Sequence, residues 1–259
     1  MFKVFSLLKQ QITLKVRRVR KRRVKLKKWK DLEFKYGIKK SVIQYSKSQC
    51  YQDVLVLQAL KYKRKGYFVD VGASDGEKFS NSWILEKIYG WNGILVEPAK
   101  TWHKPLHQNR GTTIDKRAIY KKSKERVDFH QVQIGELSTI DEYVGSDTHR
   151  ERRLNSIVYS VQTVTLNELL RYHKAPRTID YVSIDIEGAE WDAISTFNFE
   201  EYNVLIWTIE HNFTKNREKI FNLMTNKGYI RIFEEETKFD DFYVRKIDLN
   251  SFLKTIDLP

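Results

Sequence analysis

The chain has 259 residues and a mass of 31.0 kDa, and 41% of its residues are hydrophobic, which suffices for one sizeable core but not for two independent ones. The single cysteine, Cys50, excludes an internal disulfide framework and a cysteine-rich zinc site. No apolar run reaches membrane-spanning length, and the first ten residues have too short an apolar core for a signal peptide. We therefore expect a cytoplasmic protein.

The net charge of +14 is concentrated at one end of the chain. Residues 1–30 hold 13 lysines and arginines and no acidic residue, whereas residues 31–259 hold 34 basic and 33 acidic residues, a net charge of +1. A nucleic-acid enzyme usually spreads positive charge over its catalytic face, whereas residues 31–259 of this chain are nearly neutral. We expect the basic arm to contact an anionic membrane surface, another polyanion or nucleic acid, or to remain a solvated extension.

Apolar spacing predicts alternating helices and strands along the rest of the chain. Helices are expected at 48–62, 83–89, 101–109, 166–172, 189–197 and 217–227. Strands are expected at 67–71, 93–97, 112–119, 157–164, 179–184, 204–209, 229–233 and 242–245, with a β-rich segment at 125–132 and a long polar loop at 144–156. This alternation predicts an α/β fold in which helices cover both faces of a parallel sheet.

A short apolar strand runs directly into an acidic, glycine-containing turn at residues 67–76, YFVDVGASDG. Glycine at 72 and 76 lets the backbone turn sharply beside a ligand. The turn is not the dinucleotide-binding pattern, because Ser74 and Glu77 stand where glycines are required. Asp70, Asp75 and Glu77 repel a pyrophosphate and suit a ligand that carries an ammonium or sulfonium ion. S-adenosylmethionine is such a ligand.

A second acidic residue follows the next predicted strand. Glu97 stands roughly 20 residues beyond the first turn, where a ribose-binding acid is expected, and Pro98 holds it in an extended conformation. A carboxylate there can accept hydrogen bonds from both ribose hydroxyl groups. Taken alone, Glu97 could equally be a solvated acid before a turn.

A second acidic cluster lies in the sequence IDYVSIDIEGAEWDAI, residues 179–194, where Asp185, Glu187 and Glu190 follow a buried strand. The carboxyl ends of parallel strands meet at one edge, so Asp185 should face the same cleft as Asp70 and Glu97. If the next strand is its neighbour, that strand brings three further polar residues to the cluster. These are Glu210, His211 and Asn212.

This cluster has three possible roles. Oxygen ligands from Asp185 and Glu210, with His211 or Asn212, suit Mg²⁺ or Mn²⁺ better than zinc, and such an ion could lower the pKa of a substrate hydroxyl. Without a metal, Glu187 or His211 could act as general base. Alternatively, Glu187 and Glu190 cap the following helix and His211 is a structural residue.

Several linked motifs in this order resemble the FkbM family of S-adenosylmethionine-dependent methyltransferases, and the resemblance runs from about residue 48 to residue 245. The motifs are SQCYQD at 48–53, FVDVGASDG at 68–76, SNSWILE at 80–86, GWNGILVEP at 90–98, the pair at 109–110 and the acidic segment at 179–194. The resemblance implies a class I methyltransferase (Rossmann-like) fold with a mostly parallel seven-stranded sheet. It also implies O-methylation of a sugar, polysaccharide or other hydroxyl-bearing acceptor.

The resemblance assigns roles position by position. It places Asp70, Gly72, Ala73 and Ser74 around the methionine part of the cofactor, with Asn81 as their companion, and makes Glu97 the ribose-binding acid. It places the stretch from Asp115 to Ala118 beside the adenine, and Asp185, Glu187 and Gly188 near the transferred methyl group. Gln52 and Asp53 match an upstream motif without assigned contacts.

A further resemblance concerns the metal. Metal-dependent enzymes such as catechol O-methyltransferase have an Asp after the fourth strand and an Asp-Asn pair after the fifth. Here Asp185 is followed by Glu210-His211 instead. We expect residues 1–47 to be a basic extension and 48–259 to form an S-adenosylmethionine-dependent methyltransferase domain acting on a sugar or glycan. The alternatives are a nucleic-acid methyltransferase guided by the arm, and a non-catalytic cofactor-binding module docked on a membrane or polyanion.

Overall fold

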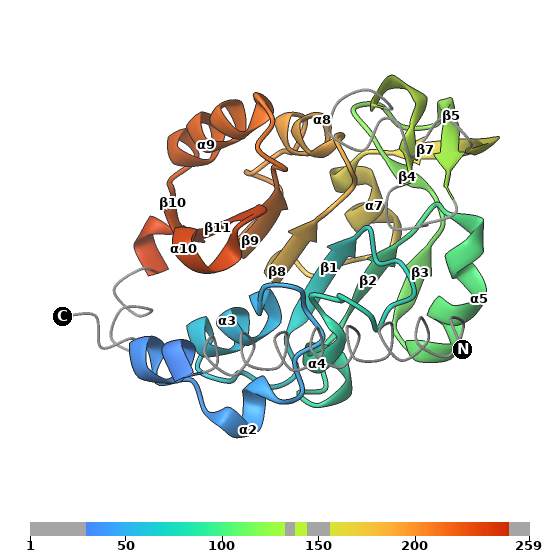
Figure 1. Ribbon diagram of the computed structural model, residues 1–259. Coiled ribbons are helices and arrows are strands. Elements are labelled where there is room, and N and C mark those ends of the chain that lie inside the picture. The colour runs from blue at the N-terminus through green and yellow to red at the C-terminus, as the bar shows by residue number, and fades with distance from the viewer. Residues whose placement is uncertain (1–29, 133–137, 144–155, 249–259) are drawn as a thin grey trace, which may run out of the picture.

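A seven-stranded sheet forms the centre of the protein in a computed structural model that describes residues 30–132, 138–143 and 156–248 (Figure 1). In spatial order its strands are β10 (Tyr229–Ile232), β11 (Asp240–Arg245), β9 (Asn203–Glu210), β8 (Thr178–Ile184), β1 (Tyr67–Val71), β2 (Asn92–Val96) and β3 (Thr113–Asp115). All neighbours are parallel except the two pairs that include β11. The predicted mostly parallel seven-stranded sheet is confirmed.

The chain order changes direction between β1 and β8, which are neighbours in the sheet although about a hundred residues separate them. From β1 the chain moves outward through β2 to β3, and from β8 it moves the other way to β9. Ligands of open α/β sheets bind at such a point, beyond the carboxyl ends of the strands. This topology places the ends of β1, β2, β8 and β9 around one crevice.

Helices cover both faces of the sheet, as predicted (Figure 1). On one face lie α2 (Lys40–Ile43), α3 (Gln52–Ala59) and α4 (Trp83–Lys87), and on the other lie α7 (Leu166–Tyr172), α8 (Glu190–Ser195) and α9 (Asn216–Asn226). The central strands are apolar on both sides, since both faces pack against helices. Two further helices, α5 (Lys100–Asn109) and α10 (Glu234–Thr237), lie at the two ends of the sheet, and α10 was not predicted.

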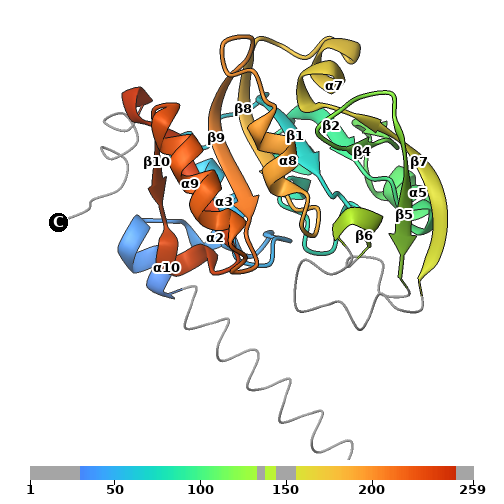
Figure 2. The ribbon, with the colours of Figure 1, turned by 90° about the horizontal axis from the view of Figure 1, so that it is seen from above.

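A small second sheet stands at one end of the crevice, with strand order β4 (Ala118–Ile119), β7 (Ile157–Val164), β5 (Arg126–Gln131) and β6 (Thr139–Ile140) (Figure 2). The single strand predicted over 112–119 is wrong, because its two halves form β3 and β4 in different sheets. Asp115 causes the break: its Oδ1 accepts the backbone N–H of Arg117 at 2.9 Å, and this local turn ends β3.

Part of the predicted basic extension belongs to the folded core. Residues 30–36 are helical, and Leu32, Tyr36 and Ile38 are buried among residues of α3 and of the central sheet. The remainder of that extension, residues 1–29, lies outside the described residues, as do residues 144–155 of the predicted polar loop. Within the described ranges, none of the helices has both the length and the apolar character needed to cross a membrane.

Candidate functional site

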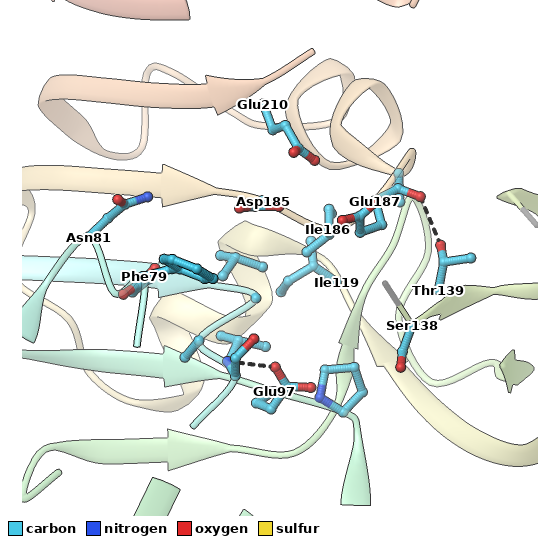
Figure 3. A pocket seen from close by; sticks show the side chains of 18 of the residues that line it. Phe79, Asn81, Glu97, Ile119, Ser138, Thr139, Asp185, Ile186, Glu187 and Glu210 are labelled. Atoms are coloured by element: carbon cyan, nitrogen blue, oxygen red, sulfur yellow. Dashed lines mark hydrogen bonds between the residues drawn. The ribbon is translucent and has the colours of Figure 1, made fainter. Parts of the chain in front are cut away.

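A cavity of 710 Å³ opens where the carboxyl ends of β1, β2, β8 and β9 meet (Figure 3). Its floor comes from the central sheet, and β5 and β6 of the second sheet close one side through Phe129, Thr139 and Ile140. The topology therefore brings together segments that are far apart in the sequence. Most of the residues predicted to bind the cofactor line this cavity, together with Pro98 next to Glu97: Asp70, Gly72, Ala73, Ser74, Asn81, Glu97 and Ala118.

Glu97 is held rigidly at the end of β2. Its two carboxylate oxygens accept the backbone N–H groups of Ser74 at 2.8 Å and Ala99 at 2.7 Å, and the side chain is buried (Figure 3). Burial raises the pKa of Glu97 to about 7, although both hydrogen bonds oppose that shift. Each oxygen keeps a further lone pair, so Glu97 can still accept two hydroxyl groups from the cavity.

Asp70 is the buried end of a hydrogen-bonded chain that sequence reasoning missed. The Ser82 hydroxyl donates to Asp70 at 2.5 Å and in turn accepts a guanidinium N–H of Arg110 at 3.0 Å. Arg110 also donates to the carbonyl of Gly76 at 3.0 Å and to Glu86 at 2.5 Å. One buried arginine thus ties the acidic turn to α4. The pair at 109–110 appeared in the sequence only as part of a family motif.

Asn81 lines the cavity and is fixed to the central sheet. Its amide nitrogen donates to Ser183 of β8 at 3.0 Å, whereas its buried Oδ1 has no hydrogen-bond partner among the described residues. The hydrogen bond to Ser183 fixes the side chain of Asn81 against β8 at the cavity wall.

Three carboxyl groups gather at the opposite side of the cavity from Glu97 (Figure 3). Oxygens of Asp185, Glu187 and Glu210 lie within 4.8 Å of one another. Glu187 has a left-handed backbone with φ 55°, and its carbonyl accepts the Thr139 hydroxyl of the second sheet at 3.0 Å. Only a small fraction of non-glycine residues adopt this conformation. The second sheet therefore holds one member of the cluster in place.

The crowding of these acids changes their ionisation. Burial raises the pKa of Asp185 to about 6 and raises that of Glu210 well above its usual range, and the neighbouring carboxylates raise the pKa of Glu210 further. Carboxyl groups this close repel each other when both are ionised, which favours a proton on one of them. We assign this proton to Glu210. The cluster can thus hold a proton, and its charge suits a cationic ligand.

His211, expected as a general base or metal ligand, does not belong to this group. Along β9, successive side chains point to opposite faces, so Glu210 reaches the cavity and His211 does not. Its Nδ1 accepts the backbone N–H of Phe213 at 3.0 Å, and its Nε2 lies 3.7 Å from Asp241. In the possible metal set, Glu187 stands beside Asp185 and Glu210 where the sequence suggested His211 or Asn212.

Asp115, expected beside the adenine, is also outside the cavity. Its carboxylate pairs with Arg117 at 2.5 Å and with His173 Nε2 at 2.8 Å, and these partners lower its pKa although burial opposes them. Its backbone carbonyl accepts the N–H of Glu97 at 2.9 Å. Asp115 therefore supports the neighbouring strand end. Of the stretch from 115 to 118, Ala118 is the residue that lines the cavity, and Ile119 next to it does so as well.

The structure adds a fourth acid, Asp240, which the sequence did not single out. Asp240 begins β11 directly opposite Glu210, lines the cavity and accepts the side-chain amide of Gln52 at 2.6 Å. Burial raises its pKa to about 8. This contact explains the upstream motif at 48–53, since Gln52 also joins the cavity wall. No local pattern identifies Asp240, because only the antiparallel pairing of β9 and β11 brings it here.

The sequence matches the family model described as the Methyltransferase FkbM domain over residues 70–247. No curated protein matches the chain at a significant level. Among solved structures, the chain is similar to precorrin-6y C5,15-methyltransferase from Geobacter metallireducens, with 9% identity, 74% and 85% of the two chains covered, and a TM-score of 0.41. TrmK from M. capricolum with bound S-adenosylhomocysteine shows 13% identity, 73% and 65% coverage, and a TM-score of 0.34.

A methyltransferase from Geobacter sulfurreducens in complex with S-adenosylhomocysteine gives 10% identity, 73% and 67% coverage, and a TM-score of 0.35. These three structures are too distantly similar to support a conclusion about this chain. The family match, in contrast, spans more than half of the chain.

Proposed function

The chain belongs to the FkbM methyltransferase family, and we propose that it transfers the methyl group of S-adenosylmethionine to a hydroxyl group of a sugar or glycan. The family membership makes the chain an S-adenosylmethionine-dependent methyltransferase of class I fold. The acceptor is our inference, and it depends on one observation: the carboxyl cluster of Asp185, Glu187 and Glu210 lies in the same cavity as the cofactor-binding turn.

The residues of the cavity fit the three parts of the cofactor. Glu97 would accept the ribose hydroxyl groups, and the apolar Ile119 and Phe129 would flank the adenine. The turn around Gly72 and the neighbouring Asn81 would receive the amino-acid part. The sulfonium would then lie toward the carboxyl cluster, whose negative charge favours a cation.

Methylation of a hydroxyl group requires that its proton be removed as the new bond forms. The acceptor oxygen attacks the methyl carbon, the bond from methyl to sulfur breaks, and S-adenosylhomocysteine leaves as a neutral thioether. The hydroxyl proton passes to Glu187, whose carboxylate lines the cavity beside the reacting groups. Most of the rate enhancement would come from holding the oxygen in line with the carbon–sulfur bond.

The same cluster fits a divalent ion. Asp185, Glu187 and Glu210 offer three carboxylate oxygens, the ligands that Mg²⁺ and Mn²⁺ prefer, within 4.8 Å of one another. A bound ion would lower the pKa of the acceptor hydroxyl. The three carboxylates would orient that hydroxyl group, and the ion would balance their negative charge. Thermal unfolding with added Mg²⁺ or Mn²⁺ tests binding without reference to activity, and Asp185→Asn should abolish any stabilisation.

Radiolabelled methyl transfer into oligosaccharides tests the proposed function directly. We expect Glu187→Gln to lower kcat roughly 100-fold or more while S-adenosylhomocysteine still binds in calorimetry. Glu200→Gln, a substitution at an exposed glutamate, is the matched control and should leave both quantities unchanged. Full activity of Glu187→Gln would remove its assigned role, and absence of S-adenosylhomocysteine binding to the wild type would contradict the cofactor.

Sugar acceptors are favoured over nucleic acid by the charge of the site. The residues around the reacting centre are acidic, and the chain beyond residue 30 has a net charge of only +1, so no excess of positive charge neutralises phosphates. Methylation of RNA that is lost on deleting residues 1–29, with no activity on oligosaccharides, would contradict this assignment. Binding of anionic vesicles without turnover on any hydroxyl acceptor would support the non-catalytic alternative.

A further inference from the structure

Two phenylalanines stand at the mouth of the cavity instead of packing into the core. Phe213 is 68% exposed and Phe239 is 36% exposed, and both line the cavity. Their rings meet edge to face, with centroids 6.1 Å apart. The pair comes from two different segments, the turn after β9 and the residue before β11. It therefore forms a continuous apolar surface beside the carboxyl cluster.

The backbone is unfavourable at Phe213 and at the residue before Phe239. Phe213 has φ 57°, Asn212 before it has φ 40°, and Lys238 before Phe239 has φ 53°. Bulky residues rarely adopt this left-handed region, and burial of the Phe213 ring does not offset the cost because most of that ring is exposed. Strain of this kind is retained where a conformation serves a site.

His211 connects the turn after β9 to the segment before β11. Its Nδ1 accepts the backbone N–H of Phe213 at 3.0 Å, its backbone N–H donates to the carbonyl of Phe239 at 2.8 Å, and its ring packs edge to face on Phe213 at 5.1 Å. Because Nδ1 accepts a backbone N–H, it carries no proton in this arrangement. His211, which the sequence suggested as a general base, instead holds the two phenylalanines in place.

The groups beside the pair define the ligand that it fits. Asp240 follows Phe239 directly, and Glu210 lies opposite Asp240 in the sheet register, so carboxyl groups border the apolar surface. A sugar ring has an apolar face of C–H groups, which packs on an aromatic ring, and a rim of hydroxyl groups, which donate to carboxylates. A phosphate-bearing nucleotide would meet repulsion from the same acids.

We propose that Phe213 and Phe239 form the platform on which the sugar ring of the acceptor lies, and that His211 is the positioning residue of this platform. The inference rests on the proposed function, since it names where that acceptor binds. It also places acceptor recognition in the 234–241 stretch and in the turn after β9, while the cofactor is held by the strand ends on the other side of the cavity.

The test starts with oligosaccharides built from hexoses, deoxyhexoses and N-acetylhexosamines, screened for radiolabelled methyl transfer by the full chain. With the accepted oligosaccharide, Phe213→Ala should raise the acceptor KM about tenfold or more, with a smaller change in kcat. Phe213→Trp should retain a low KM because it keeps a flat aromatic face. Phe34→Ala, which removes a phenylalanine that is 94% exposed elsewhere, is the matched control and should change neither constant.

His211 is tested by a conservative and a disruptive substitution. Its Nδ1 is replaced by an acceptor oxygen in His211→Asn and is lost in His211→Leu. We expect the acceptor KM to stay within about threefold of the wild type for the first and to rise about tenfold for the second. A general base would show the other pattern, a loss of kcat in both variants. S-adenosylhomocysteine binding by calorimetry shows that each variant is folded.

The outcomes distinguish a failure of the proposed function from a failure of the platform alone. If no oligosaccharide is methylated, the proposed function fails and the platform fails with it. If an oligosaccharide is methylated and Phe213→Ala keeps the wild-type KM, the platform alone is overturned. If Phe213→Ala does not fold, Phe213→Leu decides, because leucine is apolar but lacks the flat face and should still raise KM. Methylation of RNA in place of oligosaccharides would overturn the sugar assignment.

Discussion

A Cβ atom at position 72 would lie 1.8 Å from the carbonyl oxygen of Asp185, so only glycine allows the turn after β1 to pass this close to the end of β8. Gly72 also has φ +90°, which side chains disfavour. The contact sets the spacing between the two walls of the cavity. It joins the acidic turn, which the sequence assigned to the cofactor, to the cluster assigned to the chemistry.

Substitution Gly72→Ala should therefore destabilise the protein by roughly 2–4 kcal/mol, because the backbone of Asp185 must move and a left-handed alanine is strained. Urea unfolding measures the loss, and calorimetry should show weakened S-adenosylhomocysteine binding in the folded fraction. Gly111→Ala is the control, since its Cβ would find its nearest neighbour at 3.6 Å without a positive φ. Equal stability of the two variants would refute the assigned role of Gly72.

The central sheet could be predicted from sequence because its signals are local. Apolar runs such as 67–71 and 179–184 mark buried strands, and their polar ends mark the crevice. The second sheet could not be assembled in this way. Its strands β4 and β6 have only two residues each, and the Asp115 turn that separates β3 from β4 depends on one side-chain hydrogen bond.

The same distinction applies to the site. Asp70 lies at the end of β1, Glu97 follows β2, and Asp185 and Glu187 come just after β8, so chain order alone placed these four residues in the cavity. Strand alternation directs the side chains of the pair Glu210-His211 to opposite faces, so only Glu210 enters the cavity. Asp240 and Phe239 enter through antiparallel pairing near the end of the chain, which no short motif encodes.

Cofactor binding should depend on the ionisation of Glu97. The pKa of this group is about 7 in the free protein, and ribose hydroxyl groups donate best to its ionised form. S-adenosylhomocysteine affinity should therefore rise as pH increases through 7 and level off above it, with a proton released on binding. Calorimetry between pH 5.5 and 8.5 in buffers of different ionisation enthalpy measures both effects.

The variant Glu97→Gln separates this group from the other acids that titrate in the same range. Glutamine keeps one acceptor oxygen and never ionises, so affinity should fall about tenfold at pH 8 and lose most of its pH dependence. If the variant retained the wild-type pH profile, another acid of the cavity would be responsible.

Arg110 should contribute both to stability and to cofactor binding. Its side chain is fully buried and bonded to Glu86, and it lowers the pKa of that glutamate although burial opposes the shift. Removing it in Arg110→Met takes the buried counter-charge from Glu86, which keeps Lys87 at 3.1 Å, and should cost roughly 2–4 kcal/mol. Arg64→Met, at an exposed arginine, should cost less than about 0.5 kcal/mol in the same unfolding experiment.

Because Arg110 also holds Ser82 against Asp70, Arg110→Lys should preserve part of the stability but not the geometry of the turn. We expect S-adenosylhomocysteine to bind this variant roughly tenfold more weakly. Unchanged affinity in a folded Arg110→Lys protein would limit the arginine to a structural role.

Stability should decrease as pH rises from about 5 to 8, the reverse of the trend produced by ordinary paired carboxylates. Burial raises the pKa values of a set of carboxyl groups, so the folded state binds more protons than the unfolded state in this window. The groups are Asp53 and Asp185 at about 6, Glu97 and Glu190 at about 7, and Asp240 at about 8. Glu86 and Asp115, whose pKa values are lowered, are already ionised there.

Thermal unfolding of the ligand-free protein should accordingly show a Tm several degrees lower at pH 8 than at pH 5.5, since one pKa unit corresponds to about 1.4 kcal/mol. Asp240→Asn keeps an acceptor for Gln52 and cannot ionise, so its Tm should fall less over this range. Glu200→Gln should follow the wild type. A Tm that increases steadily from pH 5.5 to 8 would show that these acids are not desolvated in the folded protein.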